Sequence, residues 1–133
     1  MKNSNLKNLP SIFAEIYKTT IEKNGFTFSI SQNKFKTGKG FAVATVKSSE
    51  RIFSNFNKMP KNEFVDVLRS FYIENLDNFI KDENLCIGGW IDENRLFLDV
   101  STVIDCKKTA LKIAAKNSEL AIFDLSTFET IFL

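Results

Sequence analysis

The sequence LCIGGWIDENRLFLDVSTVID, residues 85–105, contains two strand-like patterns on either side of a short polar turn. From residue 96 the side chains alternate between two faces, with Leu96, Leu98 and Val100 on one and Phe97, Asp99 and Ser101 on the other. A period of two residues is typical of a strand that buries one face. Asp92-Glu93-Asn94 has turn chemistry, because Asp closes an Asx turn and Asn tolerates a left-handed backbone. The stretch therefore predicts a β-hairpin, on which the other elements pack.

Two glycines and the chain's single tryptophan lie in the first strand of this hairpin. Glycine weakens a strand, so Gly88-Gly89 predicts either a bulge or a close approach of backbone beside Trp90. Trp90 is open to two interpretations. It packs in the core, which is the more frequent role of a lone tryptophan in a small domain, or it forms an exposed platform for recognition.

An amphipathic helix is predicted after Pro10, because residues 12–21 place apolar side chains at helical spacing. Asn24-Gly25 is a stop signal in which Gly25 is expected to take the left-handed conformation. The polar residues 1–8 that precede the helix are expected to be frayed.

Further helices and strands complete the predicted fold. Pro60 opens a helix with an expected break near residues 72–75, and Asp105 is the expected cap of another helix that ends at Asn117. The remaining strand patterns cover residues 26–31, 41–46, 51–53, 120–125 and 130–133. This order predicts a single α+β domain over residues 1–133, with three to four helices packed mainly on one face of a largely antiparallel sheet. The expected core includes Phe28, Val43, Phe71, Leu98, Leu111 and Ile122.

The composition argues against several kinds of chemistry. The chain has no histidine, which removes the commonest general base, the Ser-His and Cys-His nucleophile pairs and most catalytic zinc sites. Cys86 and Cys106 are the only cysteines, no secretory signal is visible, and no apolar run approaches the roughly 20 residues of a membrane span. We therefore expect a cytoplasmic protein with reduced thiols, without catalytic residues, metal or cofactor and without membrane contact.

The net charge of +2 hides an uneven distribution along the chain. Residues 1–62 carry a net charge of +8, and residues 63–133 carry −6. Such a division would give one basic and one acidic face, and a salt-sensitive association with a charged partner. Alternatively, the two halves interleave in the fold and neutralise each other. The sequence leaves both interpretations open.

The segment QNKFKTGKG, residues 32–40, is a basic loop. Its TGKG part is similar to a phosphate-binding loop, but the upstream glycine of such loops is missing. The segment also leads into a strand, whereas a phosphate-binding loop leads into a helix. We expect its lysines to contact phosphates or an acidic protein surface. Phe35 is open to three interpretations: it anchors a protein partner, it stacks on a nucleic-acid base, or it packs back on the sheet. The predicted partner-binding residues are Lys34, Phe35, Lys36, Lys39 and Trp90.

Four aspartates near the predicted strand ends are the candidates for a metal cluster: Asp92, Asp99, Asp105 and Asp124. Their spacing matches no calcium loop, and Asp92 and Asp105 already have roles in a turn and a cap, so we expect no metal. Asp99 interrupts an apolar strand beside Ser101, and it is expected to face solvent or to hydrogen-bond a neighbouring helix.

The segments GGWID, LDVS and LAIFDL, in residues 88–92, 98–101 and 120–125, resemble a pattern in small proteins of phages, prophages and conjugative elements. That uncharacterised family tends to show Gly-Gly-Trp-Val-Asp, then Tyr-Leu-Asp-Val-Ser, a short helix, and Asn-Gln-Leu-Ala-Ile-Trp-Asp-Leu. The segment GKGFAVATVKSSERIF resembles the family's other recurring stretch, whereas Ser118-Glu119 departs from its preferred Gln. The resemblance implies an origin in a mobile element and assigns no catalytic residue.

Two classes of function follow from these observations. The first is a non-enzymatic binding protein of a phage or mobile element that blocks a host defence nuclease by protein–protein contact, in the manner of an anti-CRISPR protein. Its partner would be a host protein or ribonucleoprotein complex. The second is an accessory protein of phage or plasmid replication or conjugation, which contacts nucleic acid through the basic N-terminal half.

Overall fold

A computed structural model describes residues 9–133, so the expectation of frayed residues 1–8 lies outside the described part. Four helices are present in that part: α2 (Leu9–Lys23), α3 (Lys61–Glu74), α4 (Leu76–Lys81) and α5 (Lys107–Lys116). Two short 3-10 turns lie at Lys47–Ser49 and Phe56–Lys58. The strands are β1 (Gly25–Ser29), β2 (Lys34–Phe35), β3 (Phe41–Ala44), β4 (Arg51–Phe53), β5 (Cys86–Asp92), β6 (Arg95–Ile104), β7 (Ala121–Asp124) and β8 (Glu129–Phe132).

The strands form one antiparallel sheet in the order β2-β1-β5-β6-β3-β7-β8, with β4 paired to the first half of β6. The predicted hairpin is confirmed, because β5 pairs with β6 from Cys86 opposite Ser101 to Asp92 opposite Arg95. Strand β3 from the basic half of the chain lies between β6 and β7 from the acidic half, and β1 pairs with β5. The two halves therefore interleave, as the second interpretation of the charge division proposed.

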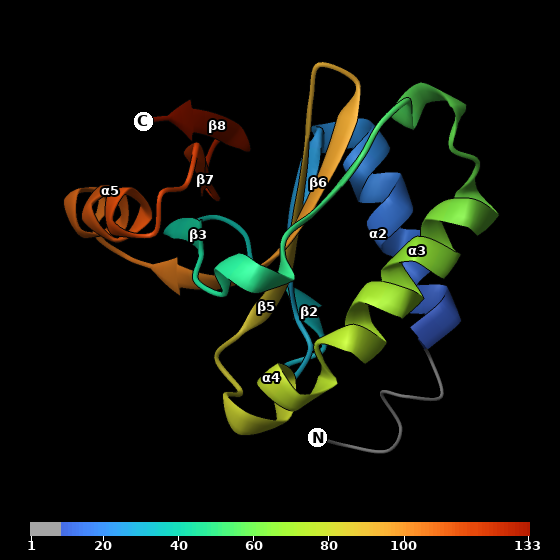
Figure 1. Cartoon of the computed structure of the whole chain (residues 1–133), viewed down its shortest axis with the longest axis horizontal. Helices are drawn as coiled ribbons and strands as arrows, with labels where there is room; N and C mark the ends of the chain where they lie inside the picture. Colours follow the sequence, from blue (N-terminus) through green and yellow to red (C-terminus); the bar gives the residue numbers. More distant parts are fainter. Residues whose placement is uncertain (1–8) are drawn as a thin grey trace.

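The sheet is strongly curled, and its helices lie on the convex face. Gly25 of β1 touches Phe123 of β7, although three strands separate β1 and β7 in the sheet: a Cβ on Gly25 would lie 2.8 Å from the Phe123 ring. Helices α2 and α3 pack together at one end of the molecule, and α5 packs on β3 and β7 at the other, with the strands between them (Figure 1). The predicted α+β class is confirmed, and none of the helices of residues 9–133 covers the opposite, concave face of the sheet.

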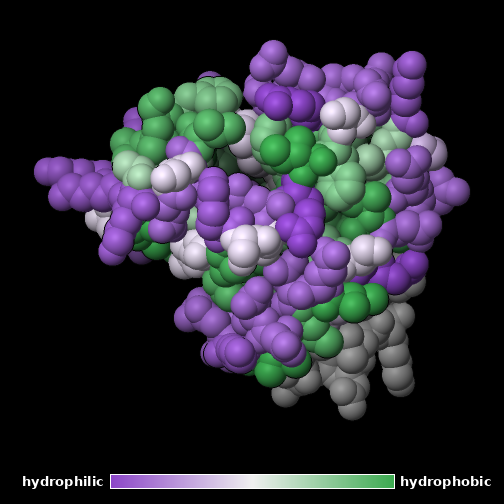
Figure 2. Space-filling view, in the orientation of Figure 1, coloured by the Kyte–Doolittle hydropathy of each residue, from purple (hydrophilic) through white to green (hydrophobic). Residues whose placement is uncertain are grey.

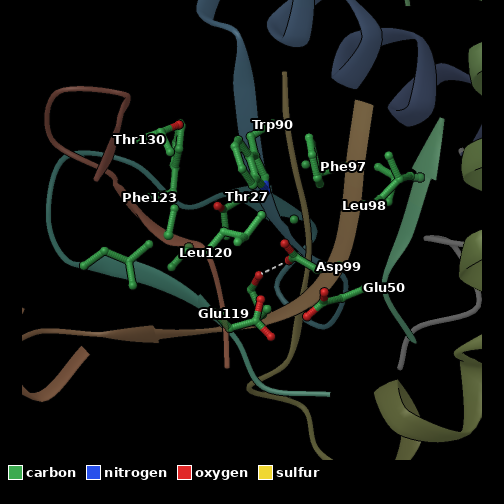
Figure 3. A pocket seen from close by; sticks show the side chains of 18 of the residues that line it. Thr27, Glu50, Trp90, Phe97, Leu98, Asp99, Glu119, Leu120, Phe123 and Thr130 are labelled. Carbon is green, nitrogen blue, oxygen red and sulfur yellow. Dashed lines mark hydrogen bonds between the residues drawn. The ribbon is translucent and has the colours of Figure 1, made fainter. Parts of the chain in front are cut away.

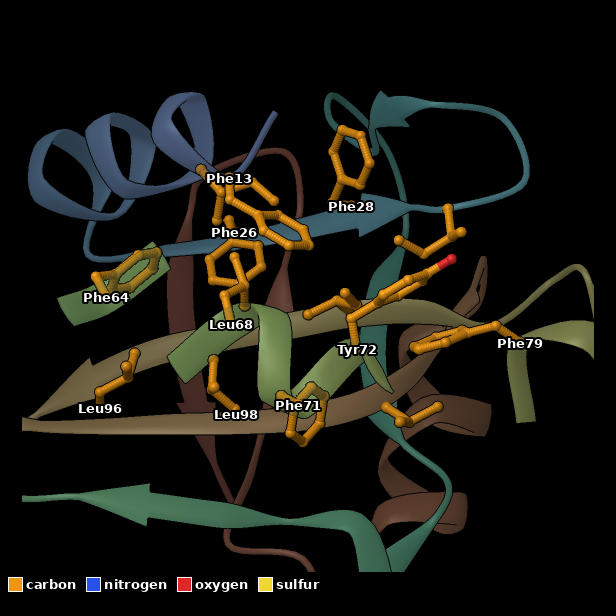
Figure 4. Close-up of a cluster of buried hydrophobic side chains, with 14 of the residues drawn as sticks. Phe13, Phe26, Phe28, Phe64, Leu68, Phe71, Tyr72, Phe79, Leu96 and Leu98 are labelled. Carbon is orange, nitrogen blue, oxygen red and sulfur yellow. The ribbon is translucent and has the colours of Figure 1, made fainter. Parts of the chain in front are cut away.

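The main core lies between the sheet and helices α2 to α4 (Figure 4), and it is rich in phenylalanine. Ring contacts connect the two long helices with each other, for example Tyr17 with Phe64, whose ring centroids are 5.2 Å apart. Five of the six predicted core residues are buried, namely Phe28, Val43, Phe71, Leu98 and Ile122. Leu111 is only half-buried, because α5 turns Ala110 and Ala114 toward the sheet and keeps Leu111 at the side of the contact.

Two predicted helix ends differ in detail. Asn24, with φ of 63°, takes the left-handed conformation at the end of α2, and Gly25 already belongs to β1. Cys106 rather than Asp105 precedes the first turn of α5, and no side chain caps that helix. The expected break of the second helix is confirmed at Asn75, which separates α3 from α4 and donates its side-chain amide to the Phe71 carbonyl at 2.9 Å.

The two glycines of β5 are explained by close side-chain approach. The strand pairs without a bulge, with Gly88 opposite Asp99 and Gly89 opposite Leu98, so the expected bulge was wrong. The expected close approach is present, but side chains make it and not the backbone. A Cβ on Gly89 would collide with the ring of Phe26, and one on Gly88 would collide with the Asp99 carboxylate and the Ser101 hydroxyl. Gly88 thus leaves room for two polar side chains on the concave face.

Candidate functional site

The concave face of the sheet encloses a cavity of about 280 Å³. One wall comes from β7, β8 and the turn before β7, including Phe123, Leu120 and Thr130. The other wall comes from β1, β5 and β6, including Trp90 and Phe97 (Figure 3). Because the curl of the sheet brings β7 near β1, residues from nearly the whole length of the chain meet at this cavity. We call it the concave cavity.

Two stacked aromatic rings form the apolar part of the concave cavity. Trp90 and Phe97 are paired across β5 and β6, and their ring centroids are 4.3 Å apart with an interplanar angle of 15°. The Phe132 ring of β8 contacts Trp90 edge-on at 6.0 Å between centroids. Trp90 is half-buried, so it is neither a core residue nor a free platform, and its ring packs against both Phe97 and Phe132.

Three carboxylic side chains gather at one end of the concave cavity, from Glu50, Asp99 and Glu119 (Figure 3). Asp99 points inward from β6 and accepts a hydrogen bond from the Ser101 hydroxyl. Glu50 comes directly before β4, where the pairing of Arg51 with Leu98 places it beside Asp99. Asp99 therefore faces the cavity, and neither of its expected environments, solvent or a neighbouring helix, is found.

Among residues 9–133, Lys47 is the single cationic side chain that lines the concave cavity. Its Nζ atom lies 3.4 Å from Glu50 Oε1 and 3.6 Å from Glu119 Oε2, and it donates to the Ser118 carbonyl at 3.1 Å. The Lys47 side chain is 54 % exposed, whereas that of Glu119 is 9 % exposed. One long and half-solvated ammonium group therefore only partly offsets the negative charge of the three acidic groups.

Burial changes the protonation of this acidic group. It raises the pKa of Asp99 to about 6, an effect that the Ser101 hydrogen bond opposes and the nearby charge of Glu50 reinforces. It also raises the pKa of Glu119 to about 8, together with a carboxyl–carboxyl contact to Glu50, while Lys47 acts in the opposite direction. At neutral pH the acidic end therefore keeps a proton that isolated carboxylates would release.

Three buried oxygen atoms at the concave cavity have no hydrogen-bond partner in the described part of the chain. They are Thr27 Oγ1, Glu50 Oε2 and Glu119 Oε2. Thr27 is only 2 % exposed, and its side chain lies beside Trp90 and opposite Phe123 (Figure 3). An unpaired buried polar atom costs about 1–3 kcal/mol, so three of them at one cavity mark a place suited to donors from another molecule.

Large apolar side chains surround the mouth of the concave cavity. Four of the seven exposed large apolar residues in the described chain belong to this rim: Ile52 (57 % exposed), Leu120 (62 %), Phe132 (57 %) and Leu133 (52 %). Ile52 and Leu120 line the cavity, Phe132 contacts Trp90, and the Leu133 amide donates to the Leu120 carbonyl at 3.0 Å. Apolar surface lies on both sides of a hollow between β7–β8 and the β5–β6 hairpin (Figure 2).

The structure separates the predicted partner-binding residues. Phe35 pairs with Phe28 across β2 and β1 and packs on its ring at 5.2 Å between centroids, so it is tucked back on the sheet. Lys34 and Lys39 are exposed, and Lys36 donates to the Gln32 side chain at 2.9 Å. Trp90 lies at the other end of the sheet's β1–β5 pair, opposite Gly25. Of the predicted set, only Trp90 lines the concave cavity.

Sequence reasoning missed Thr27, Glu50 and Glu119 as site residues. The polar face of β6 was visible in the alternation of Asp99 and Ser101, and the register of β4 would have placed Glu50 beside them. Glu119 carries no such signal, because its approach to Asp99 depends on the curl of the whole sheet.

No protein-family profile, curated protein or solved structure matches the chain. The resemblance to small phage and mobile-element proteins therefore stays a prediction. Within residues 9–133, none of the helices combines the length and apolar character needed to cross a membrane. In the same residues, no three or more acidic or cysteine side chains are grouped so that they could hold a metal ion.

Proposed function

We propose that this chain is a non-enzymatic binding protein that captures a segment of a partner protein in the concave cavity. The observation that carries the proposal is the rim of exposed apolar side chains around an enclosed, partly acidic hollow. Soluble proteins expose such concentrated apolar surface mainly where another molecule covers it.

The rim and the cavity together fit a protein segment better than other ligands. The rim side chains come from β4, from the turn before β7 and from the C-terminal strand, so the apolar surface extends beyond a cavity of about 280 Å³. A small ligand would fill the hollow and leave the rim exposed. Phosphate groups of nucleic acids or lipids would be repelled by the negative charge that remains at the acidic end of the cavity. Fixed aromatic rings such as Trp90 are frequent anchors at the centre of protein interfaces.

The resemblance to mobile-element proteins supports a more specific form of this proposal. A small phage or mobile-element protein that binds a host defence nuclease, or the ribonucleoprotein complex that contains it, would act in the host cytoplasm by occupying a surface of its target. Such an inhibitor needs a binding surface and no reaction, in the manner of an anti-CRISPR protein.

Capture from host lysate with matched variants tests the proposal. The rim variant Ile52→Ser/Leu120→Ser removes two exposed apolar side chains beside the concave cavity. The control variant Ile73→Ser/Ile80→Ser removes two equally large side chains, 60 % and 70 % exposed, on α3 and α4. We expect the parent and the control to capture the same protein, and the rim variant to capture about tenfold less at equal concentration. Equal capture by the rim variant would exclude the concave cavity as the docking site.

A second candidate function, contact with nucleic acid, is supported by α5. Lys108, Lys112 and Lys116 recur at every fourth position of this helix, and all three are exposed. A row of this kind follows a phosphate backbone well. Binding of duplex DNA or RNA that weakens steeply with salt, and that Lys108→Gln/Lys112→Gln/Lys116→Gln abolishes, would favour this function. Resistance of the lysate capture to nuclease treatment would favour the protein-binding function.

A further inference from the structure

We propose that the acidic end of the concave cavity binds the guanidinium group of an arginine side chain that the partner segment presents. This inference rests on the proposed function, because it names the chemistry by which the same cavity recognises its partner.

The charges around the cavity favour a cation. Among residues 9–133, three carboxylic groups and a single ammonium group line it, and the half-exposed Lys47 ammonium lies 3.4 and 3.6 Å from the carboxylate oxygens it contacts. A second cationic group inside the cavity would offset the remaining negative charge in an environment where water screens it little. The Glu119 side chain is only 9 % exposed, so its ionised form gains the most stabilisation from such a cation.

The unpaired acceptors favour a group with several donors. Thr27 Oγ1 and Glu50 Oε2 are buried acceptors without donors in the described chain, and Glu119 Oε2 has only the 3.6 Å ion-pair contact with Lys47 Nζ. A guanidinium carries five N–H groups in a rigid plane, whereas an ammonium carries three around a point. Donors directed to several oxygens at once are therefore better supplied by arginine than by lysine.

The aromatic wall favours arginine for a second reason. The stacked Trp90 and Phe97 rings line the cavity beside its acidic end. A guanidinium is more weakly hydrated than an ammonium, and it packs favourably on aromatic faces. The apolar rim would hold the neighbouring side chains of the partner segment, so we expect an arginine flanked by apolar residues.

Binding of the arginine is expected to release protons. The charged side chains that line the cavity are Lys47, Glu50, Asp99 and Glu119. A bound cation stabilises the ionised carboxylates and so lowers the raised pKa values of Asp99 and Glu119. Proton release makes the affinity rise with pH, from below the pKa of Asp99 near 6 to above that of Glu119 near 8.

The probe for the test is N-acetyl-L-arginine amide, titrated into the whole chain. The single tryptophan, Trp90, lies at the cavity, so its fluorescence reports the binding. The corresponding lysine amide and the neutral citrulline amide serve as ligand controls. We expect saturable binding of the arginine probe, about tenfold weaker binding of the citrulline probe, and an intermediate affinity for lysine.

Protein variants locate the site. Asp99→Asn and Glu119→Gln should each weaken the arginine probe about tenfold and remove part of its pH dependence. Glu15→Gln, on the exposed side of α2, is the matched control and should bind like the parent. Both pocket substitutions replace a buried ionisable group with a neutral one of the same shape, and circular dichroism verifies that each variant is folded.

The outcomes separate this inference from the proposed function. Three results would overturn the arginine inference. They are equal affinity for the arginine and citrulline probes, no saturable binding of the arginine probe to the parent, and unchanged affinity for that probe in both pocket variants. The proposed function would still stand if the rim variant then failed to capture the partner. Saturable, pH-dependent arginine binding with normal capture by the rim variant would show that the cavity binds a guanidinium. It would refute docking of the partner there, and with it the claim that the partner presents the arginine.

Discussion

Replacing Asp99 by asparagine is expected to stabilise the protein at neutral pH. Burial raises the pKa of this carboxyl from 3.8 to about 6, a difference equivalent to about 3 kcal/mol against the folded state once the group is ionised. Asparagine avoids that cost, and its side-chain oxygen can still accept the Ser101 hydrogen bond, whose effect the pKa of about 6 already includes. We therefore expect Asp99→Asn to increase the free energy of unfolding by about 2–3 kcal/mol at pH near 7.5.

The sign of this effect depends on pH. Because the folded protein holds the Asp99 proton more tightly than the unfolded chain, this group stabilises the fold at low pH, and the contribution disappears as the pH rises through about 6. The advantage of Asp99→Asn should thus vanish near pH 4, where the parent carries the neutral acid.

Urea unfolding of the parent and Asp99→Asn at both pH values, followed by circular dichroism and Trp90 fluorescence, measures the difference. Urea is preferred to guanidinium chloride, whose cation would bind the proposed site. If the variant is less stable than the parent by the same amount at both pH values, the claim that burial of the ionised Asp99 carboxylate destabilises the fold is refuted.

Three other predictions concern the core, the glycine contacts and the basic loop. Leu98→Ala should lower the free energy of unfolding by about 2–5 kcal/mol in a urea titration, because Leu98 is fully buried between the sheet and the helices; a parent-like value would contradict the register of β6. Gly89→Ala should cost about 1–3 kcal/mol by the same measurement, because the Phe26 ring must move away from the new methyl group; an unchanged stability would show that this ring is free to move. The triple variant of Lys34, Lys36 and Lys39 to Glu should capture the partner from lysate as well as the parent does, and a loss of capture would return the binding site to the basic loop.

The parts of the fold that depend on local patterns could be predicted from the sequence. The β5–β6 hairpin follows from the alternation that ends at Ser101 and from the left-handed residues Glu93 and Asn94, with φ of 49° and 60°. The break at Asn75 was visible as an interruption of helical spacing. Phe35 could not be assigned, because its burial depends on a cross-strand contact with Phe28 that one segment alone does not specify.

The candidate site could be predicted only in part, because it is built from long-range contacts. Trp90 and Asp99 were noticed individually, but nothing in the chain indicates that Glu119 lies near them. These side chains come together only because the sheet curls and brings β7 near β1, where the Phe123 ring lies against Gly25. A sequence pattern identifies which face of a strand is polar, and the curvature of the sheet decides what that face encloses.

Hydrogen–deuterium exchange on the chain, alone and in complex with the captured partner, tests the central claim most directly. Docking in the concave cavity predicts slower exchange at residues 50–53 and 118–133, which carry the rim and one wall, with unchanged exchange at residues 34–40. Slower exchange confined to residues 34–40, or to α5 with its exposed lysines, would contradict it and place the partner on a basic surface.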